Sequence, residues 1–213
     1  MIERGMIFNG EMVRAILDGR KTQTRRPVKL PVHDKNLGCE LAGNELAGEL
    51  SAGNYLNSAF GKPGDRNWVR ETFRVHSRAT DVATLVYKAS VRNSWTEQTH
   101  RVPVSVCNKP ATPEKWTPSL HMPRWASRIL LEITDVRVER LNAISEEDAR
   151  AEGIIDGGCL NCGEPEPCGC ANPEPDATDA FAYLWQSIYG QENWNANPWV
   201  WVIEFKRVKG GAA

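Results

Sequence analysis

The apolar segment near the end of the chain, NPWVWVIEFKRV at residues 197–208, constrains the fold more than any other. Its first half is apolar at consecutive positions and does not alternate between apolar and polar residues. Aromatic and β-branched residues favour strands, and a strand that is apolar on both faces is buried on both faces. The segment therefore predicts a central strand of a sheet that is covered on its two sides.

Other segments predict further strands and short helices. A helix is expected where Met12 and Val13 recur as Ile16 and Leu17, and it should end at Gly19. Further helices are expected from Ser145, which begins a capping box with Asp148, to Gly153, and over residues 176–190. Strands are expected at residues 6–8, 66–75, 84–91 and 127–141. Because the helices and strands do not alternate regularly, the chain should be α+β and mostly β, as a small barrel with short helices and a cysteine-rich loop.

Residues 31–60 differ in composition from the rest of the chain. They include GCELAGNELAGELSAGN, which is rich in Gly, Ala and Asn and partly repeats itself. We interpret them as an insertion or a mobile flap, and the cysteine-rich loop at about 157–175 as a second insertion. The remainder of residues 1–209 should form one domain, with 210–213 as a flexible tail.

The charge and hydropathy of the chain exclude two classes of protein. With 26 Lys and Arg against 27 Asp and Glu, the formal charge is -1, which argues against coating of nucleic acid by long-range attraction. No apolar run reaches the length of a membrane helix, and MIERGMIFNG lacks the apolar run of a secretory signal. We therefore expect a cytoplasmic protein with no membrane partner.

A basic octet, GRKTQTRR at residues 19–26, follows the first predicted helix. Basic residues after a helix commonly do no more than satisfy its last carbonyls and its dipole. The same residues also suit amide hydrolysis. Neighbouring positive charges, and any burial, would lower the pKa of Lys21 toward that of a usable base. Thr24 could act as a nucleophile or hold water, and Arg26 could stabilise an oxyanion.

Four motifs together resemble one family. A helix that ends in GRKTQTR, a KPGD turn before a strand, the helix SEEDARAEG and a closing WVIEFKRV strand occur here in the order found in ASCH-domain proteins. The segment HMPRWASRI resembles members carried by phages and prophages. The resemblance covers the chain except for residues 31–60 and the cysteine loop. It implies a PUA-like β-barrel and, for a phage protein, a location in the host cytoplasm.

One branch of that family consists of amidohydrolases that deacetylate 4-acetylcytidine. The resemblance implies that Lys21, Thr24 and Glu152 are the catalytic residues here, with Arg20 and Arg26 binding substrate. Glu152 would be the proton donor. The function is therefore expected to be hydrolysis of an amide in an acylated cytidine or a similar base. Two alternatives stay open: a module that binds RNA or a modified base without turnover, and a ribonuclease. The sequence does not indicate an oligomeric state.

Aromatic residues in predicted loops are candidates for stacking on a base. Trp68 and Trp116 lie near predicted turns, and His121 could face the same cleft, although ordinary packing is the alternative for all three. Trp185, Trp199 and Trp201 lie in apolar patterns and are expected to pack in the core.

Four cysteines in CLNCGEPEPCGC offer the ligands of a zinc site. They are Cys159, Cys162, Cys168 and Cys170. Four thiolates can bind one tetrahedral zinc and leave no position open for water, so the metal would be structural and catalysis would require no cofactor. The alternative is a loop with free or oxidised thiols.

Overall fold

The structure, a computed structural model, describes residues 1–155 and 177–208. These residues form a mixed α and β protein and group into two compact units. Unit 1 consists of residues 1–19, 64–132 and 206–208, and unit 2 of the described residues in 20–63 and 133–205. Strands β9 (Leu130–Arg140) and β10 (Trp199–Arg207) contribute residues to both units.

Unit 1 contains two sets of paired strands. Strand β1 (Glu3–Ile7) lies parallel to β5 (Arg66–Arg70), and β5 pairs antiparallel with the first residues of β9. A separate antiparallel sheet has the order β6-β7-β8, with β6 Phe73–Arg78, β7 Val82–Tyr87 and β8 Thr99–Pro103. The helices are α1 (Gly10–Leu17) and α3 (Trp95–Gln98), with short 3-10 turns at Lys88–Ser90, Ser119–His121 and Arg124–Ala126.

Helix α1 forms where the sequence predicts it. The Asn9 side chain accepts a hydrogen bond from the backbone N–H of Met12 at 2.8 Å and caps the first turn. Val13 and Ile16 are buried on one face of the helix. Gly19, with a φ of 79°, then ends it in the left-handed region that glycine adopts at low cost.

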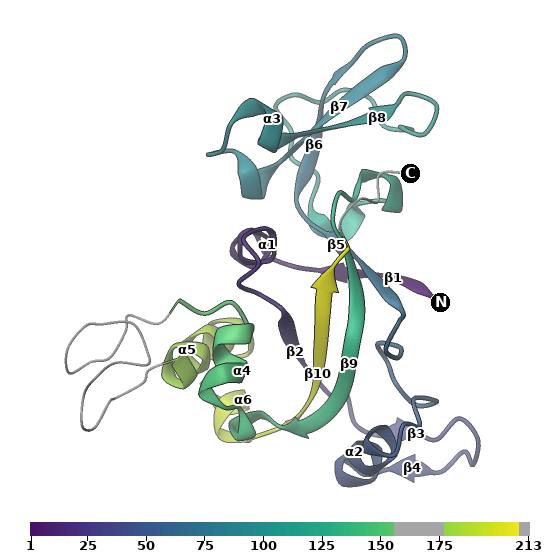
Figure 1. The fold of residues 1–213 in the computed structure, drawn as a ribbon, viewed down its shortest axis with the longest axis vertical. Helices are drawn as coiled ribbons and strands as arrows, with labels where there is room; N and C mark the ends of the chain where they lie inside the picture. The colour runs from purple at the N-terminus through teal and green to yellow at the C-terminus, as the bar shows by residue number, and fades with distance from the viewer. Residues whose placement is uncertain (156–176, 209–213) are drawn as a thin grey trace, which may run out of the picture. The chain divides into compact units, whose positions relative to one another are not determined.

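Unit 2 is organised around β10, which lies between β9 and β2 (Gln23–Pro27). Val200, Trp201, Val202 and Ile203 are all buried, so the prediction of a central strand is confirmed. Figure 1 shows the helices α4, α5 and α6 gathered beside β2 and β10. Their bounds are Glu146–Ala151 for α4, Ala177–Tyr189 for α5 and Gln191–Asn195 for α6, with a 3-10 turn at Leu141–Ala143 before α4.

An apolar cluster fixes α4 and α5 against the sheet. Phe181 and Trp185 of α5 and Ala149 of α4 are buried in one cluster with Val200 and Val202 of β10. This packing confirms the predicted core role of Trp185, and burial of such side chains contributes about 1.5–3 kcal/mol each. Because α4 is held in this way, the residues at its end have fixed positions.

Two expectations from the sequence need correction. In the described residues the strands form open sheets and none closes into a barrel. The strand expected over residues 66–75 is two strands, β5 and β6, that belong to different sheets.

Residues 31–60 contain the helix α2 (Gly43–Ser51) and the short strand pair β3 (Val32–His33) and β4 (Glu40–Leu41). Their interpretation as an insertion or a mobile flap stays a prediction.

Among the described residues, no helix is both long enough and apolar enough to cross a bilayer.

Candidate functional site

Lys21 and Glu152 meet in unit 2 although 131 positions separate them in the sequence. The Lys21 Nζ donates hydrogen bonds to Glu152 Oε2 at 2.6 Å and to the Glu152 backbone oxygen at 2.8 Å. Both residues are buried, with exposed fractions of 2% and 4%. The ammonium group and the carboxylate therefore form a buried ion pair with an additional carbonyl partner.

The backbone places these two side chains opposite each other. Lys21 and Glu152 form an isolated antiparallel β-bridge, and the N–H of Thr22 donates to the Ala151 oxygen at 2.8 Å. Glu152 is the C-cap residue of α4, and Gly153 follows with a φ of 87°. The start of α4 is fixed by Ser145, whose hydroxyl accepts from the Asp148 N–H at 3.1 Å, as the predicted capping box requires.

Burial lowers the pKa of the Lys21 amine below its ordinary value. Glu152 acts in the opposite direction, because its charge and hydrogen bond favour the ammonium form. The charges of Arg26 and Arg25 lower the Lys21 pKa further. The direction agrees with the expectation from the sequence, but the largest cause is removal from water and not the neighbouring basic residues.

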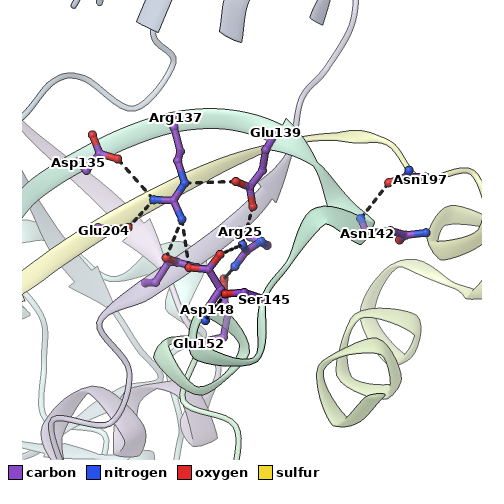
Figure 2. A network of polar contacts seen from close by, with 11 residues as sticks. Arg25, Asp135, Arg137, Glu139, Asn142, Ser145, Asp148, Glu152, Asn197 and Glu204 are labelled. Carbon is purple, nitrogen blue, oxygen red and sulfur yellow. Dashed lines mark hydrogen bonds and ion pairs between the residues drawn. The ribbon is translucent and has the colours of Figure 1, made fainter. Parts of the chain in front are cut away.

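Arg25 connects the pair to a larger group of charges (Figure 2). Its side chain is fully buried, and its Nη2 donates to Glu139 Oε1 at 2.6 Å and to Asp148 Oδ2 at 2.9 Å. Its Nη1 lies 3.5 Å from Glu152 Oε1. Arg25 thus contacts three carboxylates that come from β9, α4 and the end of α4.

Arg137 extends the network toward solvent. It contacts Asp148 at 3.1 Å, Glu139 at 3.2 Å and Glu204, and Figure 2 shows that it shares Glu139 and Asp148 with Arg25. Although partial burial alone would raise the pKa of Asp148, the charge and hydrogen bond of Arg25, together with Arg137, lower it. The Asp148 carboxyl is therefore held in its ionised form.

Two buried atoms of the site have unused hydrogen-bonding capacity. Neither Glu152 Oε1 nor Arg25 Nη1 has a hydrogen-bond partner in the part of the chain that the structure describes. An unsatisfied buried polar group costs about 1–3 kcal/mol, so such atoms are uncommon in cores. Together they present one acceptor and one donor, which is the pattern that an amide or a water molecule can bridge.

The other members of the octet occupy different positions. Successive side chains of a strand point to opposite faces, so Thr24 and Arg26 of β2 share one face and Arg25 lies on the other. Thr24 is buried, and no hydrogen bond joins its hydroxyl to Lys21 or Glu152 in the described residues. Arg20 is exposed and its Nη1 donates to the Gly153 oxygen at 3.0 Å.

The aromatic candidates lie in unit 1. An arginine guanidinium covers each tryptophan ring, with Arg70 at 5.4 Å from the Trp68 ring and Arg74 at 4.7 Å from the Trp116 ring. His121 is exposed at the end of a 3-10 turn. Each tryptophan thus already has a cation stacked on it within the protein.

The four predicted zinc ligands, Cys159, Cys162, Cys168 and Cys170, lie outside the described residues. Among residues 1–155 and 177–208 there is no group of three or more metal-ligating side chains. The zinc site stays a prediction.

Arg25 is the residue of the site that sequence reasoning missed. The octet contains it, but nothing in the sequence distinguishes a fully buried arginine from its exposed neighbour Arg20. The carboxylates it contacts at Glu139 and Asp148 are 114 and 123 positions away. In the structure, Arg25 alternates with the buried Gln23 and lies on the α4 side of β2, a placement that no local pattern in the sequence specifies.

Comparison of the chain with models of protein families, with curated proteins and with solved structures gave no match.

Proposed function

We propose that the protein is an amidohydrolase that acts on an acylated cytidine or a similar modified base, with Lys21 and Glu152 as its acid–base pair. The observation that carries this proposal is the buried contact between Lys21 Nζ and Glu152 Oε2. Burial lowers the pKa of Lys21, which makes its amine easier to deprotonate, as a general base requires. Perturbed ionisable groups of this kind are concentrated at functional sites.

The proposed reaction adds water across the amide C–N bond and releases a carboxylic acid and the free amine. Lys21, as the neutral amine, would take a proton from the attacking water or hydroxyl and pass it across the Nζ–Oε2 contact to Glu152, which would deliver it to the leaving amine. Arg25 Nη1, which has no hydrogen-bond partner among the described residues, would stabilise the oxyanion of the tetrahedral intermediate. Arg26, whose charge acts on Lys21, would assist in binding the substrate.

The ASCH resemblance supports the choice of substrate. It names Lys21 and Glu152 as partners on sequence motifs alone, and the two residues are in contact. We therefore retain an ASCH-like, PUA-like relationship as part of the proposal, with the strands in open sheets. An acylated nucleoside also fits a chain with a formal charge of -1 better than a long RNA does.

The experiment that tests this function is incubation of the protein with 4-acetylcytidine, followed by chromatography. We expect cytidine and acetate to appear in equal amounts, at a rate proportional to enzyme concentration. Other acylated cytidines define the tolerance for the acyl group. If the nucleoside is recovered unchanged but binds, as measured by calorimetry, the protein is a modified-base binding module and not a hydrolase. Cleavage of RNA with no deacylation would favour the ribonuclease.

Thr24 provides a separate prediction. If its hydroxyl attacks the carbonyl or holds the attacking water, Thr24→Val should lower kcat by on the order of 100-fold, because the hydroxyl is lost with little change in shape. Thr24→Ser, which keeps the hydroxyl, should retain most of the activity. Steady-state kinetics of the two variants make the comparison. Equal activity of the valine variant and the wild type would remove Thr24 from the mechanism.

A further inference from the structure

Unit 1 contains a cavity of about 510 Å³ that the proposed hydrolase site does not use. It lies between the start of α1, the segment that joins β5 to β6 and the 3-10 turn that follows β7. This volume is in the range of small-molecule sites, which is about 300–1,000 Å³. All of its lining residues belong to unit 1.

Three cations line the cavity. They are Arg14 of α1, and Lys88 and Arg92 in and after the turn that follows β7. None of the three forms an ion pair with another residue of the described chain. Arg14 Nη1 donates a 3.4 Å hydrogen bond to the backbone oxygen of Ala89.

The one carboxylate in the lining is already neutralised. Glu71 is buried, and both of its oxygens accept from Arg128, at 2.9 Å from Nε and 3.0 Å from Nη2. Arg128 is itself fixed by a hydrogen bond to the Ser90 hydroxyl at 2.8 Å and by the Tyr87 ring 4.0 Å from its Cζ. The cations at the cavity therefore keep a net positive charge that Glu71 does not cancel.

The backbone adds to the positive field. Gly10, the first residue of α1, lines the cavity, so the positive end of the helix dipole lies at its wall.

An apolar wall of the cavity is formed by Ile7, Phe8, Ala89 and Val91, and the polar residues Asn9, Thr72 and Ser119 complete the lining. We propose that this cavity binds a phosphate-bearing small molecule of nucleotide size, with the phosphate at Arg14, Lys88 and Arg92 and the organic part against the apolar wall. Three cations and a helix N-terminus exceed what a single carboxylate needs and suit a phosphate dianion. The proposal does not depend on the hydrolase function, since no residue is shared.

Calorimetric titration with adenosine 5′-monophosphate tests the proposal, with adenosine and inorganic phosphate as separate ligands. We expect one saturable site per chain for the mononucleotide and weaker binding of both fragments. Lys88→Ala and Arg92→Ala should each weaken mononucleotide binding about 10-fold, which is the size of one lost charge-assisted hydrogen bond. Both side chains are exposed, so their removal should leave the thermal unfolding midpoint unchanged.

The matched controls are Arg101→Ala and Lys115→Ala, which remove exposed cations of unit 1 that do not line the cavity. They should bind as the wild type does. The proposal is overturned if the mononucleotide does not bind, if adenosine binds equally well, or if the Lys88 and Arg92 variants keep wild-type affinity. Equal affinity for inorganic phosphate and the mononucleotide would overturn the proposal that the apolar wall binds the organic part of the ligand.

Discussion

Lys21→Met and Glu152→Gln are each expected to lower kcat/KM for 4-acetylcytidine by about 100- to 10,000-fold, the usual effect of losing one acid–base group. Methionine keeps the length of the lysine side chain but cannot accept a proton. Glutamine keeps the shape of the carboxylate but cannot deliver one. The measurement is the initial rate of cytidine release at several substrate concentrations, followed by chromatography.

A control for these variants lies on the same helix. Glu147 is exposed on α4 and takes no part in the contact, so Glu147→Gln should react at the wild-type rate. Circular dichroism at the assay temperature must show that each variant is folded. If folded Lys21→Met deacetylates 4-acetylcytidine at the wild-type rate, the hydrolase mechanism proposed for Lys21 and Glu152 is wrong.

The elements predicted well from the sequence are those specified by local patterns. Gly19 marks the end of α1, Ser145 and Gly153 mark the ends of α4, and the consecutive apolar residues of β10 indicate its burial. The helix within residues 31–60 is harder to predict because small residues weaken the helical pattern. In the structure Leu46 and Leu50, one helical turn apart, are buried on one side of α2, and Trp199 packs directly against Gly43.

The contacts of the site are harder to predict because they are long-range. The ASCH resemblance pairs Lys21 with Glu152, but the octet alone is equally typical of a helix end. The role of Arg25 depends on which face of β2 it occupies and on carboxylates from β9 and α4. A single-residue shift in strand register would exchange Arg25 for Thr24 on that face, and no local pattern specifies the register.

The same burial that suits Lys21 to catalysis makes the pair important for stability. Removal of one partner from a buried ion pair costs about 3–5 kcal/mol, because the other charge remains buried without a partner. We therefore expect Glu152→Leu alone to lower the free energy of unfolding by about that amount. The double variant Lys21→Met/Glu152→Leu should recover most of the loss, since two apolar side chains of similar size replace the pair. The free energies of unfolding of Lys21→Met, Glu152→Leu and the double variant, measured in urea, complete a double-mutant cycle. If Glu152→Leu and the double variant lose the same free energy of unfolding, the prediction is contradicted.

The pH dependence of the free energy of unfolding shows whether burial or Glu152 has the larger effect on the pKa of Lys21. Because burial lowers the pKa of folded Lys21, the unfolded chain binds the proton up to a higher pH than the folded chain does. The contribution of Lys21 to the free energy of unfolding should therefore rise with pH between the folded pKa and the ordinary lysine pKa, by at most about 1.4 kcal/mol per pH unit, and should be constant below that window. Lys21→Met lacks the titrating group, so the difference between wild type and variant should change in favour of the wild type as the pH rises toward the ordinary lysine pKa of about 10.4. A difference that stays constant would show that Lys21 titrates alike in both states, and one that moves in favour of the variant would show that Glu152 outweighs burial and holds the lysine charged.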